Sequence, residues 1–272
     1  MESSDSELEE SEKDSSETSP SSLFNNSEAD VTFISADKIV FKIHSKYFEA
    51  TSGGFAVPEY TLVEEPVDLA ESGEVLEILF QYIHPPSELG KFLQPSVMDL
   101  DTDLFFEVAK AAEKYIVYSV MNMCIMRMQF TLYESHPIAV LNHAANHNYE
   151  ELADLAAPNT IPCSLEEILE GLTNPCVAVQ WFKYYSRWVQ LQKTVVELMR
   201  QAELSYPECR QHTTRLTMFL RNIIHDPSNV DFDLATPGLG CGYRGGCECE
   251  SGKWKTRIEN EVEAIPNFSE IT

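Results

Sequence analysis

Apolar and polar residues alternate over two short stretches near the start of the chain. The apolar positions of these stretches are Val31, Phe33, Ile39, Phe41 and Ile43. A polar segment, Ala36-Asp37-Lys38, separates them, and alternation on both sides of a polar turn is typical of a β-hairpin. Residues 44–55 follow with apolar positions and a break at Ser52-Gly53-Gly54, so we expect a short helix after the hairpin.

The next segments read as a strand and an amphipathic helix. Residues 66–69 predict a third strand, and Ser72 is a suitable N-cap for a helix from Gly73 to Ile83. Apolar residues recur in this helix at helical spacing: Val75, Leu76, Ile78, Leu79, Tyr82 and Ile83. His84-Pro85-Pro86 should end it, because proline cannot continue a helix.

Helical periodicity dominates the rest of the chain. The expected helices cover residues 104–116, 120–128, 137–145 and 149–157, a segment after the capping box Ser164-x-x-Glu167, a long aromatic-rich segment after Asn174-Pro175, and residues 207–226 and 254–264. The apolar face of the helix at 104–116 includes Ile116. The order of elements predicts an α/β fold, a small sheet covered by helices, followed by an all-helical C-terminal extension.

Several short motifs resemble those of BTB/POZ domains. They are Asp30 with Val31-Thr32-Phe33, Phe41-x-x-His44, Glu71-Ser72 and Ala112-Glu113-Lys114-Tyr115. The pattern is most similar to the large set of fungal BTB-domain proteins. The resemblance implies a BTB/POZ-like domain over residues 28–130, and the helical periodicity predicts a helical extension over 131–272. It also implies a protein–protein interaction module that self-associates as a homodimer or binds a protein partner.

The resemblance suggests roles for individual residues. The aspartate and histidine that match Asp30 and His44 are near-buried structural groups, and the aspartate often pairs with a basic residue after the histidine. Ser45 stands at that position here, so we expect a hydrogen-bonded structural role for both residues. In the family, the first helix and strand contribute to the dimer face. We therefore expect this face to include Tyr47, Phe48, Phe55 and the exposed edge of the strand at Val31.

An alternative from another class is a substrate adaptor of a cullin-type ubiquitin ligase. Family members that bind cullin scaffolds commonly follow the central helix with a Tyr-Thr-Gly strand, whereas this chain has His84-Pro85-Pro86 and an insertion through about Asp103. A transcription regulator would need a basic patch or a zinc-finger array, and neither occurs in the sequence. No nucleophile elbow, phosphate-binding glycine loop or paired-carboxylate motif is present, so we expect no enzymatic activity.

Charge narrows the class of partner. The 272 residues carry a formal net charge of −25, and residues 1–23 hold eight acidic residues against the single Lys13. That Ser-rich acidic segment offers little to bury, so we expect residues 1–23 to be a disordered tail. A chain this negative repels phosphate backbones and anionic lipid, which disfavours nucleic acid and membrane as partners.

The distribution of cysteines and the hydropathy of the chain indicate the cellular compartment in which we expect the protein. The seven cysteines are mostly scattered singly, which is typical of reduced thiols in the cytoplasm or nucleus. No run approaches the length of apolar residues that a membrane span needs, and the acidic N-terminus does not resemble a secretory signal.

The sequence contains two groups of residues of the types that bind metal ions. Cys209, His212, Cys241, Cys247 and Cys249 offer soft ligands, and three of them lie in a Gly/Cys-rich loop at 238–252. Their spacing differs from that of zinc knuckles, so free thiols are the favoured interpretation, with no cofactor. His143 and His147 lie four residues apart on a helix without an acidic or cysteine partner, and we interpret them as a surface pair.

The cysteine interpretation predicts a protein without stoichiometric metal. Elemental analysis of the purified chain should find no zinc, and a chelator should leave the melting temperature unchanged. Stoichiometric zinc with a chelator-sensitive melt would contradict this, because metal-binding energy is then part of the folding energy. Cys249→Ser would in that case destabilise the C-terminal helices.

Overall fold

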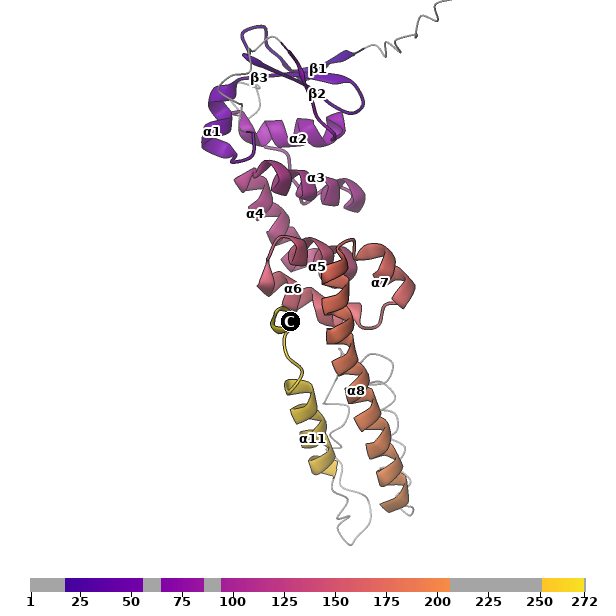
Figure 1. Ribbon diagram of the computed structural model, residues 1–272. Helices are drawn as coiled ribbons and strands as arrows, with labels where there is room; N and C mark the ends of the chain where they lie inside the picture. Colours follow the sequence, from indigo (N-terminus) through magenta and orange to yellow (C-terminus); the bar gives the residue numbers. More distant parts are fainter. Residues whose placement is uncertain (1–17, 56–64, 86–93, 206–250, 272) are drawn as a thin grey trace, which may run out of the picture. The chain divides into compact units, whose positions relative to one another are not determined.

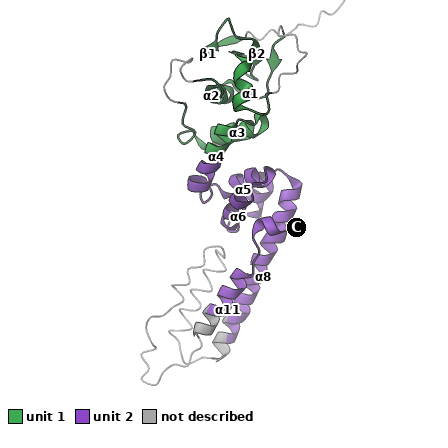
Figure 2. Ribbon diagram, turned by 90° about the vertical axis from the view of Figure 1, so that its left-hand side faces the viewer, with its two compact units in different colours: residues 1–124 green, residues 125–272 purple. Residues whose placement is uncertain are grey.

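The computed structural model describes residues 18–55, 65–85, 94–205 and 251–271. The chain divides into two compact units, residues 1–124 and 125–272, which Figure 2 shows in different colours. The division falls within one helix, close to the expected boundary at residue 130. The first unit contains a small mixed sheet with helices, and the second is helical, so the chain has an α/β part followed by a helical region.

The sheet of the first unit has four strands in the order β1-β3-β2-β4 (Figure 1). The strands are β1 (Ser19–Asn25), β2 (Val31–Ile34), β3 (Ile39–Ile43) and β4 (Val67–Asp68). β2 and β3 form the predicted hairpin, antiparallel with Phe33 opposite Phe41, while β1–β3 and β2–β4 are parallel. The predicted hairpin and third strand are confirmed.

The hairpin turn is fastened to the start of the following helix. Lys38 has a positive φ of 67°, which the tight turn requires. The Asp37 carboxylate accepts hydrogen bonds from the Ser35 hydroxyl at 2.5 Å and from the Gly73 N–H at 2.8 Å. These bonds hold the pKa of Asp37 below its ordinary value, against the opposing effect of burial. The turn therefore fixes where α2 begins.

The prediction of a disordered tail over residues 1–23 is wrong at its C-terminal end. β1 begins at Ser19 and pairs with β3, with Ser19 opposite Ile39. The Ser21 hydroxyl accepts hydrogen bonds from the N–H groups of Leu23 and Phe24 at 3.2 Å, and Phe24 is buried. Backbone pairing and burial of one aromatic ring order a segment whose composition is polar. Residues 1–17 lie outside the described residues.

Short helical segments complete the first unit. They are η1 (Ser45–Tyr47), α1 (Phe48–Thr51), α2 (Gly73–Ile83), α3 (Thr102–Tyr115) and α4 (Tyr118–Arg127). The bounds of α2 and its N-cap Ser72 are as predicted, and the Ser72 hydroxyl accepts from the Val75 N–H. Placing Ile116 on the apolar face of α3 was wrong, because this residue is the left-handed C-cap and is 37% exposed.

The core of the first unit is aromatic and centred on Phe80 of α2. Phe80 is fully buried, and its ring centroid lies 5.3–5.8 Å from those of four other rings. These rings belong to Phe24, Phe33, Phe41 and Phe55. One side chain thus joins α2 to β1, β2, β3 and the segment that follows α1.

The Ser52-Gly53-Gly54 break binds the end of α3 through backbone groups. The Ser52 hydroxyl and the Gly54 N–H both donate to the Tyr115 carbonyl at 2.9 Å, and the Gly53 N–H donates to the Ile116 carbonyl at 3.0 Å. A Cβ on Gly54 would lie 2.5 Å from the carbonyl carbon of Tyr115. The close backbone approach therefore requires glycine at this position.

The second unit is helical. It contains the π-helical turn η2 (Met128–Leu132), α5 (Pro137–Asn146), α6 (Glu150–Ala156), η3 (Ala157–Thr160), α7 (Leu165–Gly171), α8 (Pro175–Ser205), α11 (Ser251–Glu263) and η4 (Phe268–Glu270). The capping box of Ser164 and Glu167 is confirmed. α11 packs beside α8 (Figure 1) and begins at Ser251, so the last two residues of the predicted loop at 238–252 are helical.

Buried polar contacts fix the second unit. The indole N–H of Trp181, a fully buried residue of α8, donates to the Thr160 hydroxyl at 2.7 Å. The Asp154 carboxylate accepts from the backbone N–H and the hydroxyl of Ser269 at 2.7 and 2.8 Å, which fastens η4 to α6. Among the helices in the described ranges, none is long and apolar enough to cross a membrane.

Gly53 and Gly54 provide a matched test of the close backbone approach between Gly54 and the end of α3. Gly54→Ala should lower the free energy of unfolding by about 1–3 kcal/mol, because its Cβ meets backbone that cannot move independently. Gly53→Ala should cost less, because its Cβ meets the Tyr118 hydroxyl at 2.8 Å, the far end of an exposed side chain. Chemical denaturation of both variants measures the difference. Equal costs would contradict the close approach of Gly54 to α3.

Candidate interaction surfaces

Asp30 and Ser45 connect the start of the hairpin to the helix that follows it. The Asp30 carboxylate accepts a hydrogen bond from the Ser45 N–H at 2.8 Å and another from the Ser45 hydroxyl. Burial raises the pKa of Asp30, but these hydrogen bonds outweigh it and hold the pKa below its ordinary value of 3.8. Asp30 is exposed and not near-buried as expected, and both of its hydrogen bonds described here come from Ser45.

His44 and Tyr47 lie beside His84 at the end of α2. The ring centroid of His84 is 5.9 Å from that of His44 and 4.9 Å from that of Tyr47. His44 Nε2 lies 3.3 Å from the amide nitrogen of Asn26, and His84 is buried. His44 and Tyr47 are both half-buried. Their contacts within the unit agree with a structural role, and part of each ring still faces solvent.

The expectation that Phe48 and Phe55 line a dimer face is wrong. Both side chains are buried, with exposed fractions of 2% and 8%. Their rings stack at 4.9 Å, and the Phe55 ring stacks on Tyr115 at 4.2 Å with an interplanar angle of 7°. Both rings therefore belong to the hydrophobic core of the first unit. The strand at Val31, β2, lies between β3 and β4, and its described pairing with β4 covers Phe33 and Ile34 but not Val31.

Glu71 brings together two of the motifs that carry the family resemblance. Its carboxylate accepts from the Lys114 ammonium at 2.7 Å and from the Tyr115 hydroxyl at 2.5 Å. Burial and the hydrogen bond to Glu71 raise the pKa of Tyr115 to about 12. Burial also raises the pKa of Glu71, but the bonds from Lys114 and Tyr115 bring it below its ordinary value. This network fixes α3 to the segment before α2.

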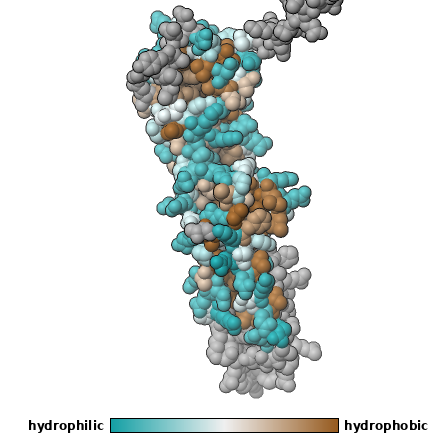
Figure 3. Space-filling view, in the orientation of Figure 1, coloured by the Kyte–Doolittle hydropathy of each residue, from teal (hydrophilic) through white to brown (hydrophobic). Residues whose placement is uncertain are grey.

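Some large apolar side chains are exposed in pairs on a helix surface, and the sequence pattern did not predict them. Met126 and Phe130 are 54% and 68% exposed, and Leu165 and Leu169 of α7 are 48% and 62% exposed. Each pair is four residues apart, so its members share one helix face. Figure 3 shows apolar side chains gathered over α7, at the right of the view. Finding these pairs from the sequence would require knowing which helix face the core uses.

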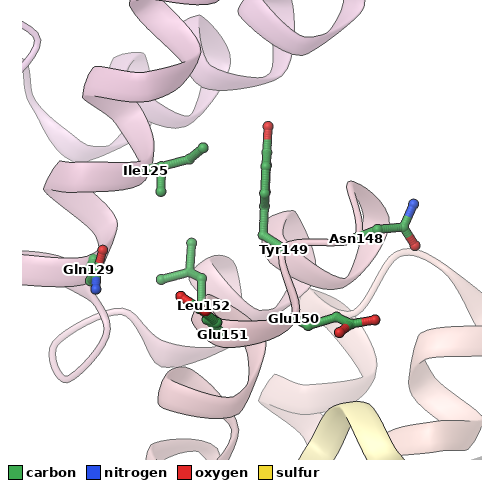
Figure 4. A pocket seen from close by; sticks show the side chains of 7 residues that line it. All are labelled: Ile125, Gln129, Asn148, Tyr149, Glu150, Glu151 and Leu152. Carbon is green, nitrogen blue, oxygen red and sulfur yellow. The ribbon is translucent and has the colours of Figure 1, made fainter.

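A surface cavity of about 270 Å³ lies between the α4–η2 region and the start of α6. Ile125, Tyr149 and Leu152 form its apolar walls, and Glu150 and Glu151 supply carboxylates (Figure 4). Both glutamates are exposed. The cavity is therefore a small site with apolar walls and an acidic edge.

The histidine pair beside this cavity differs from the expectation. His143 is buried, so interpreting it as part of a surface pair was wrong. Its ring centroid is 4.8 Å from that of His147 and 6.2 Å from that of Tyr149, with the latter rings within 15° of parallel. The pair therefore supports the aromatic wall of the cavity.

In the described ranges, no group of three or more His, Cys, Asp or Glu side chains is placed to hold a metal ion. The zinc candidates Cys209, His212, Cys241, Cys247 and Cys249 lie outside the described residues.

Comparison with known proteins gives no relative. No protein-family model, curated protein or solved structure matches the chain.

The Asp30–Ser45 contact predicts a coupled loss of stability. Asp30→Ala and Ser45→Ala should each lower the free energy of unfolding by about 1 kcal/mol, and the double variant should lose much less than their sum. Because the folded-state pKa of Asp30 is lowered, its contribution is present at neutral pH and is lost as the pH falls through that lowered pKa. Denaturation at neutral and acid pH measures both effects, with Glu28→Ala as control. Additive losses would contradict the contact.

Proposed function

We propose that the protein is a protein–protein interaction module, a BTB/POZ-like domain with a helical extension, which self-associates or binds a protein partner. The observation that carries this proposal is the exposure of large apolar side chains in helical pairs outside a filled core. Neighbouring apolar side chains that form a patch at the surface favour an interaction site, because exposing them to water is unfavourable. Glu71 hydrogen-bonds with Lys114 and Tyr115, so residues of two of the motifs on which the resemblance rests lie together.

Charge and site chemistry support a protein partner over other classes. The net charge of −25 disfavours nucleic acid and anionic lipid. A surface that combines apolar pairs with surrounding carboxylates fits recognition of another protein.

Self-association is tested at α7, where the exposed apolar surface gathers. Leu165 and Leu169 share this helix with the exposed Glu166 and Glu170. Two copies that meet through the leucines bring like charges together, so added salt should strengthen association by screening them. Sedimentation velocity of the full chain should show a concentration-dependent shift from 30.8 kDa toward twice that mass. Leu165→Ser/Leu169→Ser should remove the shift.

The matched control is Glu166→Ser/Glu170→Ser, which changes the same helix without removing apolar surface. This control should associate at least as strongly as the unmodified chain. A mass that stays monomeric up to near-millimolar concentration at every salt level would contradict self-association. So would an unchanged shift in the leucine variant.

A further inference from the structure

The helix that enters the second unit contains a π-helical turn beside the cavity. The Tyr133 N–H donates to the Met128 carbonyl at 3.0 Å, five residues back, which is the spacing of a π-helix. Such turns insert a residue into a helix and are frequent at functional sites. Phe130 lies in this turn, and it is 68% exposed.

The cavity and the exposed pair occupy adjacent faces of this helix. Ile125 and Gln129 line the cavity, while Met126 and Phe130, one residue further on in each case, lie on the neighbouring face. Figure 4 shows Ile125 and Tyr149 on opposite sides of the space, with Leu152 between them at its base. An occupant of the cavity would therefore lie next to exposed apolar surface.

Tyr149, which forms one wall of the cavity, is held in position by neighbouring residues. Its backbone N–H donates to the Ala144 carbonyl at 2.9 Å, and its ring lies nearly parallel to that of the buried His143. Asn148, just before it, has a φ of 59°, so the chain turns sharply into α6. The backbone and the stacked ring hold the Tyr149 side chain in place, which lowers the entropic cost of binding against it.

The chemistry of the lining selects one kind of occupant. Glu150 and Glu151 favour a cation, and a tyrosine face attracts one as well. The apolar walls of Ile125 and Leu152 suit the methylene stem of a lysine or arginine, which packs on apolar surface while its charge meets the carboxylates. The volume of about 270 Å³ is below that of typical small-molecule sites, and it suits a single side chain.

We propose that this cavity, together with Met126 and Phe130, is a docking site for a basic, apolar segment of a partner protein. A lysine or arginine of the segment enters the cavity, and a neighbouring apolar side chain covers Phe130. The net charge of −25 steers such a segment toward the chain. The identification of the partner as a protein rests on the proposed interaction function, but the site is separate from the α7 surface.

A defined peptide pair tests the site on the full-length chain. The probe is a short fluorescein-labelled amphipathic peptide of leucine and lysine, and the comparison peptide carries glutamine in place of lysine. Fluorescence anisotropy should show binding of the lysine peptide only, weakened by added salt. Glu150→Gln/Glu151→Gln should raise its Kd by about tenfold, because it removes the two negative charges that line the cavity. Phe130→Ser and Tyr149→Leu should each raise it by about threefold or more.

The control separates this site from diffuse charge attraction. Glu166→Gln/Glu170→Gln removes the same charge from α7 and should change the Kd by about twofold at most. Equal weakening by the two glutamine pairs would overturn the proposed site, as would unchanged binding in both Phe130→Ser and Tyr149→Leu. Melting curves show whether each variant is folded, and Glu→Gln keeps the shape of the exposed side chains.

Added salt should strengthen self-association through α7 and weaken peptide binding at the cavity. Failure of one proposal is therefore distinguishable from failure of the other.

Discussion

The fold of the first unit depends on the packing of aromatic rings around Phe80. This side chain is fully buried and contacts rings from three strands and from the segment that follows α1. Polar bonds place the surrounding segments: Asp37 fixes the start of α2, and Gly54 approaches the end of α3. A sheet with a strand as short as β4 has few backbone bonds of its own, so burial of these rings supplies much of its stability.

This packing decides which apolar side chains remain exposed at the surface. Phe48 and Phe55 are used within the unit, so they are not available as an exposed interface. The apolar side chains that remain at the surface include the pairs Met126 with Phe130 and Leu165 with Leu169. The buried aromatic core and the exposed helical pairs therefore consist of different residues. A substitution in the core should change the stability of the fold, whereas one in an exposed pair should leave it nearly unchanged.

Local patterns in the sequence predicted most elements of the fold. The hairpin, the bounds of α2 and the capping box of α7 follow from alternation, an N-cap serine and a proline stop, all of which act over a few residues. β1 was missed because its stability comes from pairing with β3 and from the burial of Phe24, neither of which its polar composition indicates.

The site was harder to predict than the fold. The cavity brings Ile125 together with Leu152, residues whose contact with one space depends on tertiary packing. The burial of His143 likewise depends on which helix face meets the core, whereas Ile116 is exposed because it ends α3 in the left-handed conformation.

Hydrogen–deuterium exchange of the full-length Phe80→Ala variant tests most directly whether Phe80 organises the first unit. Losing this ring should cost about 3–5 kcal/mol, so amides of β2, β3 and α2 should exchange much faster than in the unmodified chain. Amides of α5 and the buried turns of α8 should keep their protection, because they belong to the second compact unit. Phe130→Ala, at an exposed ring, should leave the strands unaffected. Unchanged protection of the strands in Phe80→Ala, or an equal loss in both units, would contradict the account.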